Sequence, residues 1–238
     1  MQRRVLVTRP EPGASRTATR LAAAGFAPVV LPLTEIRPLA ARPIPTDFDA
    51  VAVTSANALR HAPKSLVESI KYKPLFAVGG RTAHLARDTG FARVFEGNGD
   101  AAALAGLVAA QLTARSRVLY LCGKVRRPDF EAALTEAGLV VDALETYDTT
   151  AIIHPVERVV SIFHDEPVEA AYVLSSKTAE ALSSLVRTAP LVHLFADTRY
   201  FCISGRVAAA LTGIGPDHIL ISETPDEDAL VALLERES

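Results

Sequence analysis

The sequence has few of the residues that build redox and metal sites. Its two cysteines, Cys122 and Cys202, each end a predicted strand, and neither has a second cysteine at CxxC spacing. We interpret both as reduced, small core residues, which excludes a disulfide framework. The six histidines show no HExxH or comparable ligand spacing. A metal site is therefore not expected.

Known nucleotide-binding and nucleophile motifs are also missing. Gly79-Gly80 is not part of GxGxxG, and Gly123-Lys124 lacks the earlier glycine of a P-loop, which disfavours NAD and ATP. Ser55 and Ser175 follow predicted strands, but neither lies in GxSxG, so a hydrolase nucleophile is not indicated. The residues give no sign of a bound cofactor.

Charge of one sign and long hydrophobic runs are absent as well. The 25 basic and 27 acidic residues leave a net charge of −2, so no overall field attracts nucleic acid or an acidic membrane. The longest apolar stretch, from Leu21 to Leu33, is interrupted by glycine and proline and is too short to span a bilayer. The N-terminus leads into a predicted strand and not into a signal peptide, so we expect a cytoplasmic protein.

The pattern that is present is a strand, a helix and a second strand, and it occurs twice. Residues 117–150 contain an apolar run, apolar residues at helical spacing up to Gly138, and a second extended run. Residues 4–35 repeat this order, with the helix ending at Gly25. Further segments recur in the same order: Val53-Thr54-Ser55 with Leu174-Ser175-Ser176, Gly80-Arg81 with Gly205-Arg206, and Asp100 with Asp226. The repeat indicates two equivalent α/β units of about five strands each.

Alternating strands and helices predict parallel sheets that are covered on both faces. The predicted fold class is therefore α/β, with two parallel-sheet domains. The first domain is discontinuous and comprises residues 1–35 and 169–238, and the second is inserted as residues 50–148. Residues 36–49 and 149–168 are the predicted linkers, and two extended crossings of this kind are able to pair as a short ribbon.

Parallel sheets bind ligands outside the carboxyl ends of their strands, and the predicted loops there are rich in small residues. Backbone amides at helix starts and nearby basic side chains suit carboxylates or phosphates. Ordinary helix capping and solvated surface charge are the alternative interpretation of each loop. For Arg81 and Arg206 a binding role and an ordinary surface role are about equally favoured, because both follow a glycine at equivalent positions of the repeat. The candidate binding residues are Arg9, Ser55, Gly79, Arg81, Gly123, Lys124, Ser175, Ser176 and Arg206.

Tyr147 lies where the last strand of the inserted domain leads into the return linker. Its hydroxyl is a candidate proton donor if the side chain faces a gap between the domains. A tyrosine at the end of a strand commonly serves only for packing. Spacing alone leaves both interpretations open.

Several motifs together resemble the uroporphyrinogen-III synthase family. They are VLVTRP, VTSANAL, FAVGGRTAHLARDTGF, GDAAALAGLV, VLYLCG and LETYDT, and they are collinear over nearly the whole chain. The resemblance implies two flavodoxin-like domains joined by a two-stranded ladder, with the active site between them. It also implies an enzyme that needs no cofactor, and we expect it to act as a monomer.

The implied reaction converts hydroxymethylbilane, a linear tetrapyrrole with eight carboxylates, to uroporphyrinogen III with loss of water. Loss of hydroxide gives an azafulvenium cation, ring D attacks it, and a spiro intermediate recloses with ring D inverted. The resemblance aligns Tyr147 with the family's proton donor, and a phenol near its ordinary pKa is protonated at neutral pH. It aligns Thr82 with a threonine in a glycine-containing turn, and Ser55 and Ser175 with serines at strand ends.

One position departs from the family pattern. Arg206-Val207 occurs where relatives often have a threonine, so this turn lacks a hydroxyl. Either Arg206 substitutes as a carboxylate donor, or the chain is a catalytically degenerate binding or regulatory module. The enzyme would yield the type III product, whereas a binding module would leave only the spontaneous type I product. A glycosyl or nucleotide transferase would need phosphate or metal motifs that the sequence lacks.

Overall fold

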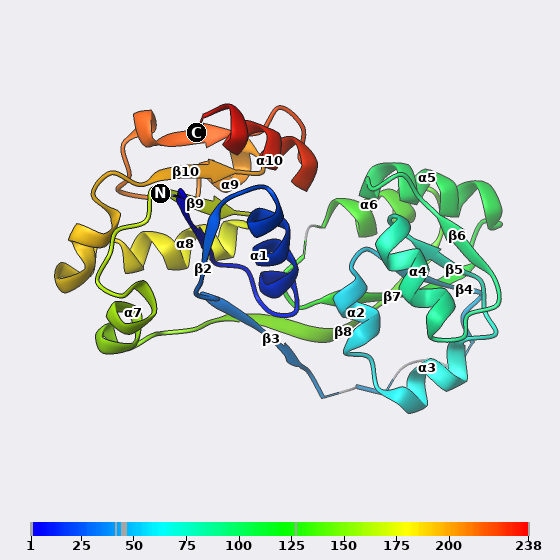
Figure 1. Ribbon diagram of the computed structural model, residues 1–238. Coiled ribbons are helices and arrows are strands. Elements are labelled where there is room, and N and C mark those ends of the chain that lie inside the picture. Colours follow the sequence, from blue (N-terminus) through cyan, green and yellow to red (C-terminus); the bar gives the residue numbers. More distant parts are fainter. Residues whose placement is uncertain (1, 41, 44–46, 127, 238) are drawn as a thin grey trace. The chain divides into compact units, whose positions relative to one another are not determined.

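The computed structural model describes residues 2–40, 42–43, 47–126 and 128–237, which form two compact α/β units (Figure 1). One unit comprises the chain up to Glu35 and from Thr150 onward, and the other comprises Ile36–Thr149. Residues 41 and 44–46 of the first predicted linker lie outside the described residues. The predicted fold class is confirmed, since both units are built on sheets with parallel strand pairs.

The first unit contains a five-stranded sheet in the order β11-β10-β9-β1-β2. All of its neighbouring strands are parallel. The central strands are buried on both faces, as the continuous apolar runs of the sequence predict. The strands are β1 (Arg4–Val7), β2 (Ala27–Val30), β9 (Ala170–Val173), β10 (Arg199–Cys202) and β11 (Ile219–Ile221).

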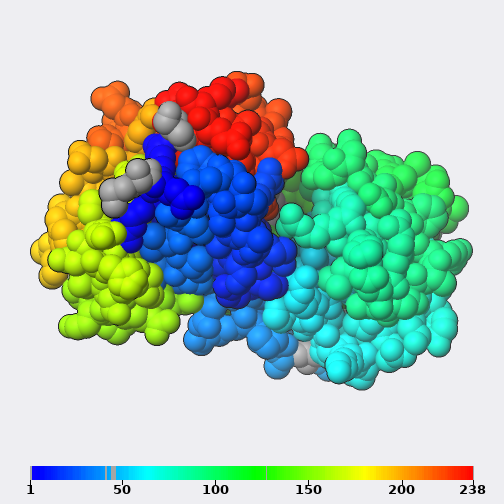
Figure 2. Space-filling model, viewed as in Figure 1, coloured from blue at the N-terminus to red at the C-terminus, as the bar shows by residue number. Residues whose placement is uncertain are grey.

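Helices cover both faces of this sheet. Helices α1 (Gly13–Ala23) and α10 (Glu227–Arg236) share a core cluster on one face, and Figure 2 shows them side by side at the surface, in blue and red. The other face carries α7 (Val156–Phe163), α8 (Ser176–Leu185), the 3-10 helix η1 (Ala189–Phe195) and α9 (Gly205–Ala208). A further 3-10 helix, η2 (Pro216–His218), leads into β11.

Helix α7 lies in the range 149–168, which the sequence predicts as a linker. The structure differs from this prediction because the helix has an apolar face that is buried within the first unit. Val159 and Phe163 are fully buried in the same core cluster as α8. The helix is therefore part of that unit and not of a connection.

The second unit contains a six-stranded sheet in the order β3-β8-β7-β4-β5-β6. Its strands are β3 (Thr34–Pro38), β4 (Ala50–Val53), β5 (Leu75–Ala77), β6 (Val94–Glu96), β7 (Arg117–Gly123) and β8 (Val140–Ala151). Helices α2 (Ala56–Arg60), α3 (Lys64–Ile70) and α4 (Gly80–Asp88) cover one face. Helices α5 (Ala101–Gln111) and α6 (Asp129–Glu136) cover the other face.

Strands β3 and β8 carry the chain between the two units and pair with each other. The Leu39 N–H donates to the Thr146 carbonyl at 2.9 Å, and the Ile152 N–H donates to the Leu33 carbonyl at 2.9 Å. These two bonds make the strands antiparallel. The predicted pairing of the two crossings is confirmed, although β8 continues through residue 148, where the inserted domain is predicted to end.

The two sheets share one strand order although the chain passes through them differently. Strands β1, β2, β9, β10 and β11, taken as first to fifth, give the flavodoxin-like order 2-1-3-4-5. Strands β7, β8, β4, β5 and β6 give the same order in the second unit. Each sheet therefore has a switch point, between β1 and β9 or between β7 and β4, where the following helices lie on opposite faces.

Candidate functional site

The switch point of the second unit brings Tyr147, Ser55 and Gly123 together. Gly123 is the last residue of β7, and Ser55 closely follows the neighbouring strand β4, so both lie at the carboxyl edge. The Tyr147 ring lies directly against Gly123, because a Cβ atom on this glycine would be 2.7 Å from Cζ of the tyrosine. Doubly wound sheets bind their ligands at this position.

A register shift between β7 and β8 determines where the Tyr147 side chain points. Cys122 pairs with Glu145, but the next residue, Gly123, pairs with Tyr147. Thr146 is therefore an additional residue on β8. Such irregularities redirect side chains and are common beside active sites.

The effect of the shift is visible in the packing of β8. Side chains in a regular strand alternate between the two faces of a sheet. Ala143 packs on the face covered by α5 and α6, and Leu144 packs on the face covered by α2 to α4. Regular alternation would place Tyr147 with Ala143, but it packs with Leu144. The extra residue therefore moves the phenol to the face that carries α2.

The Tyr147 phenol is half-buried and has polar neighbours. Burial raises its pKa above the ordinary value of 10, and hydrogen bonding with the Ser55 side chain lowers the pKa by less. The His61 ring lies 6.3 Å from the Tyr147 ring, between centroids, and burial together with Arg60 lowers the pKa of this histidine. The phenol therefore keeps its proton at neutral pH and is suited to donate it.

Thr146 connects the strand that carries Tyr147 to helix α2. Its side chain is 2% exposed, and its hydroxyl donates to the Ala58 carbonyl at 2.7 Å. Helix α2 begins directly after Ser55, whose hydroxyl accepts the Asn57 N–H at 3.2 Å. Thr146 thus holds helix α2, which His61 follows, against strand β8, which carries Tyr147.

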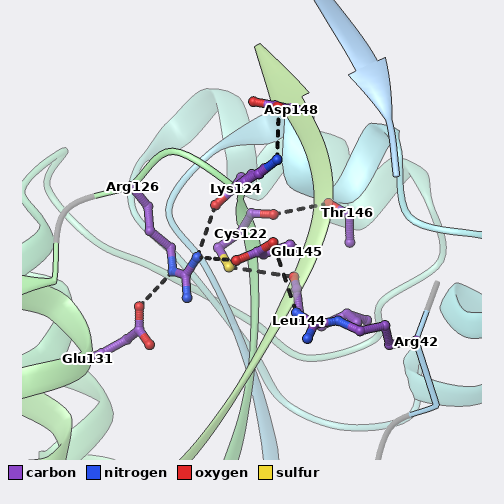
Figure 3. A network of polar contacts seen from close by, with 10 residues as sticks. Arg42, Cys122, Lys124, Arg126, Glu131, Leu144, Glu145, Thr146 and Asp148 are labelled. Carbon is purple, nitrogen blue, oxygen red and sulfur yellow. Dashed lines mark hydrogen bonds and ion pairs between the residues drawn. The ribbon is translucent and has the colours of Figure 1, made fainter. Parts of the chain in front are cut away.

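Two carboxylates neutralise Arg126 in the loop after β7 (Figure 3). Arg126 forms ion pairs with Glu131 at 2.7 Å and with Glu145 at 2.8 Å, and the hydrogen bond to Glu131 is the main cause of its raised pKa. Lys124 lies 3.8 Å from Asp148, and its side chain is 60% exposed. Of these two cations, Lys124 is the one that solvent and ligands can reach.

Cys122 belongs to the core behind this loop. Burial raises the pKa of its thiol to about 12, and its Sγ atom lies 3.5 Å from the Leu144 carbonyl that accepts its hydrogen bond. Cys122 and Cys202 are both free, buried thiols, as the sequence predicts. Within the described ranges no group of three or more His, Cys, Asp or Glu side chains is arranged to hold a metal ion.

The candidates at the start of α4 lie in different environments. Gly79 precedes the helix, and a Cβ atom there would lie 3.3 Å from Cα of Gly99, so two glycines allow close approach of the backbone. Arg81 is exposed. Thr82 is only 5% exposed and faces the core. The structure thus separates a surface guanidinium from a threonine that faces inward.

The first unit brings Ser175, Ser176 and Arg206 together at the carboxyl edge of β9 and β10. Ser175 caps α8, with its hydroxyl accepting the Thr178 N–H at 3.2 Å and donating to Thr178 Oγ1 at 2.8 Å. The Ser176 hydroxyl donates to the Arg206 carbonyl at 3.5 Å. The Arg206 side chain is exposed at the start of α9.

Arg9 lies at the carboxyl edge of β1, but its guanidinium already binds other side chains of the same unit. Its Nη1 atom is 2.8 Å from Glu227 and 3.2 Å from the Thr17 hydroxyl. The side chain is 20% exposed and also covers Gly13. The predicted role of Arg9 in binding an anion is therefore less favoured than a role in joining α1 to α10.

The departure at Val207 falls in a core position. Val207 is 1% exposed and packs with α7 and α8, and the equivalent Thr82 of the second unit is also buried. A valine here therefore removes no hydroxyl from the surface.

The sequence did not identify Thr146 or His61 as site residues. Both flank Tyr147 only because of the register shift and the short helix α2.

Comparisons with known proteins identify the family. The family model described as uroporphyrinogen-III synthase HemD matches residues 15–232. The chain is 28% identical to the uroporphyrinogen-III synthase of Salmonella typhimurium over 97% of this chain and 99% of that protein. No helix among the described residues is long and apolar enough to cross a membrane.

Two solved structures share the fold. The uroporphyrinogen-III synthetase of Helicobacter pylori matches with a TM-score of 0.67 at 20% identity, with 100% of both chains covered. A mutant uroporphyrinogen III synthase of Thermus thermophilus matches with a TM-score of 0.52 at 18% identity, covering 99% of this chain and 98% of that one. The match of the family model to most of the sequence shows that the chain belongs to the uroporphyrinogen-III synthases, the cyclising lyases of tetrapyrrole biosynthesis.

Proposed function

We propose that this chain converts hydroxymethylbilane to uroporphyrinogen III, and that the Tyr147 phenol donates the proton that lets hydroxide leave. The observation that carries this proposal is the position of the phenol at the switch point. The phenol is half-buried there, and with a pKa above the ordinary value it is protonated at neutral pH. A protonated group close to the leaving oxygen is what general acid catalysis requires.

The proposed steps balance without a cofactor. Protonation by Tyr147 breaks the bond between carbon and the hydroxyl oxygen, which releases water and leaves an azafulvenium cation. The substituted carbon of ring D attacks this cation and forms the spiro intermediate. One carbon–carbon bond of the spiro centre then breaks and reforms at the other side of ring D. The proton that is lost at the end equals the one donated, so the phenol is regenerated.

The eight carboxylates of the substrate need cationic donors whose side chains are exposed to solvent. Lys124 and Arg206 have exposed side chains, and Arg81 is also exposed. Small residues nearby let carboxylates approach backbone amides. The donors that we propose are Ser55, Gly79, Arg81 and Lys124 in the second unit and Ser175, Ser176 and Arg206 in the first.

Positioning is expected to contribute more than any single catalytic group. Hydroxymethylbilane cyclises spontaneously to the isomer in which ring D is not inverted, so the enzyme must favour one pose of the chain. Several fixed contacts supply such orientation, which is worth a large part of many catalytic rate enhancements. The carboxylate donors should therefore determine which isomer forms, and Tyr147 should determine the rate.

Isomer analysis tests the function directly. Purified protein is incubated with hydroxymethylbilane, the products are oxidised to porphyrins, and the type I and type III isomers are separated. We expect mainly the type III product. Type I alone, at the spontaneous rate, would identify a binding or regulatory module. Val207, which replaces a threonine that relatives often have, suggested such a module. Val207 is buried in a core, so this replacement does not favour the module over the enzyme.

We further propose that the protein works in the cytoplasm as a single copy, without nucleic acid. Its free, buried thiols suit a reducing compartment. Light scattering at the enzyme concentration of the assay tests the monomer, and a mass of two chains would contradict it.

A further inference from the structure

We infer that Gly123 is a positioning residue, whose lack of a side chain makes room for the Tyr147 phenol. The inference rests on the proposed role of Tyr147 as the acid. Gly123 then does not contact the substrate itself. It acts indirectly, by determining where the Tyr147 hydroxyl lies.

The geometry leaves no room for a larger residue. A Cβ atom on Gly123 would lie 2.7 Å from Cζ, 2.9 Å from the hydroxyl oxygen and 3.0 Å from Cε2 of Tyr147. Carbon atoms in contact are normally separated by about 3.5–4.0 Å. All three short distances involve the phenol end of the ring. Alanine at this position would therefore push the hydroxyl away by roughly 1 Å.

The ring cannot simply follow the backbone to a new place. The Tyr147 carbonyl accepts the Lys124 N–H at 2.8 Å, which fixes β8 beside the residue that follows Gly123. The ring also packs against the core beneath α2. The added methyl group is therefore expected to displace the phenol itself.

Backbone conformation does not explain the glycine. The glycines with positive φ are Gly25, Gly90, Gly99, Gly138 and Gly213, and Gly123 is not one of them. Alanine is thus compatible with the backbone at position 123, and in the absence of a clash such a substitution usually stabilises a protein. The contact with the phenol is the feature that requires glycine here.

Direct binding of substrate by Gly123 is also less favoured. Its open side is covered by the phenol, and the next backbone N–H, of Lys124, is used by Tyr147. A glycine that admits a ligand needs a free approach to the backbone. The approach to Gly123 is occupied by a side chain of the same unit.

The Gly123→Ala variant tests the inference. We expect kcat to fall roughly 10- to 100-fold, because a displacement of about 1 Å is costly in a catalytic site, while KM changes less than about threefold. In a Tyr147→Phe background the same substitution should cause no further loss of kcat. Gly106→Ala is the matched control, because Gly106 is exposed in α5 and a Cβ atom there meets nothing within 4 Å.

Absorbance titration of tyrosinate gives a second measurement that does not depend on activity. Subtracting the titration of Tyr147→Phe from that of the wild type isolates the Tyr147 phenol. In Gly123→Ala, with the titration of Gly123→Ala/Tyr147→Phe subtracted, this phenol should ionise at a different pH than in the wild type, because its burial and its hydrogen bonding with Ser55 both change. An unchanged titration together with unchanged kcat would overturn the inference.

Two outcomes separate this inference from the proposed function. If Tyr147→Phe retained full kcat, the acid would be lost from the mechanism, but the titration would still decide whether Gly123 positions the phenol. If Gly123→Ala proved unstable, a double-mutant cycle would test the clash: Gly123→Ala should lower the melting temperature less in a Tyr147→Ala background than in the wild type. An equal loss in both backgrounds would overturn the inference.

Discussion

At the scale of single residues, burial is the main influence on the pKa of the Tyr147 phenol. Removing a phenolate from water raises the pKa of the group, and hydrogen bonding with Ser55 offsets only part of this effect. Only the protonated phenol can act as an acid. Its contribution should therefore persist through neutral pH and be lost as the pH rises through the raised pKa.

Replacing Tyr147 with phenylalanine is expected to slow turnover without abolishing it. We expect kcat to fall by roughly 10²-fold, which is typical for loss of a general acid, while orientation by the other contacts remains. The decrease in wild-type kcat as the pH rises through the raised pKa of this phenol should disappear in the variant. Steady-state kinetics from pH 6 to pH 11 measures both effects. Complete inactivity of a folded variant, or unchanged kcat, would contradict the assignment.

Arg206 and Arg9 should respond differently to substitution. Arg206 is exposed, and we expect Arg206→Glu to raise KM for the polyanionic substrate about 5- to 10-fold, an effect that weakens in added salt. Arg9 pairs with Glu227, and Arg9→Gln should instead lower the melting temperature by about 2–4 °C and leave KM unchanged. Kinetics and thermal melts of both variants test this contrast. The reverse pattern would return Arg9 to the binding site and remove Arg206 from it.

These two arginines also illustrate what the sequence cannot reveal at this scale. Both follow predicted strands and both precede helices, so the local pattern treats them alike. Only the fold brings Glu227, which lies 218 residues away, to within 2.8 Å of Arg9. Thr82 is a similar case, because the helical pattern identifies α4 but the side that faces the core depends on packing.

At the scale of elements, one irregular position of strand β8, Thr146, connects helix α2 to the strand that carries Tyr147. The extra residue Thr146 donates to the carbonyl of Ala58, in the last turn of a five-residue helix. Carbonyls in the last turn of a helix have no partner within it and depend on such donors. Thr146 should therefore stabilise α2 and also its alignment with Tyr147.

The Thr146→Val variant isolates this hydrogen bond, because valine has nearly the same shape as threonine. We expect a loss of about 1–3 kcal/mol of stability from the unpaired carbonyl, and roughly a tenfold lower kcat from misalignment of the phenol. Thr146→Ser keeps the hydroxyl and is the matched control, with properties close to the wild type. Thermal unfolding and steady-state kinetics provide the measurements. Equal behaviour of the two variants would assign the effect to packing.

The sequence predicted the elements better than their registers. Strand and helix runs, glycine stops and the repeated order gave the strands of both sheets, and the pairing of β3 with β8 followed from the two crossings. The shift beside Cys122 has no local signal, because the residues 143–147 read as an ordinary extended run. Helix α7 was missed as part of the first unit because its burial depends on residues far away in the chain.

At the scale of the whole molecule, each unit has buried groups that ionise only in strongly alkaline solution. Burial raises the pKa of Tyr120 and Tyr200 to about 12, and that of Cys122 and Cys202 to about 12 as well. The same groups in an unfolded chain ionise near pH 10 for tyrosine and near pH 8.5 for cysteine. The unfolded state therefore releases these protons first.

Stability should consequently fall with rising pH over this range. Between about pH 9 and pH 12 the folded state holds more protons than the unfolded state, and the free energy of unfolding decreases as the pH increases. We expect a nearly constant melting temperature from pH 7 to pH 8.5 and a progressive fall above it, monitored by circular dichroism. Tyr200→Phe should make the fall less steep. A melting temperature that stayed constant up to pH 12 would contradict the burial of these groups.

The fold class was predictable at this scale because two copies of one pattern reinforce each other. Four recurring segments identified two units, and collinear motifs identified the family. The cations that stay exposed were not predictable from the sequence, because exposure depends on the partners that the fold brings to each side chain. Arg126 is the clearest example, since two glutamates neutralise it.

The shared strand order has a consequence for how such a chain arose and how it can be divided. Leaving β3 aside, β1, β2, β4, β5 and β6 form one run of five strands, and β7 to β11 repeat that run. Each sheet takes its first two strands from one run and its last three from the other, which is domain swapping within a single polypeptide. Cleavage between α5 and β7 would therefore yield two fragments that complete each other's sheets. An ancestor with one run would already have held all five strands of such a sheet, so the exchange of strands between the two runs would have followed duplication.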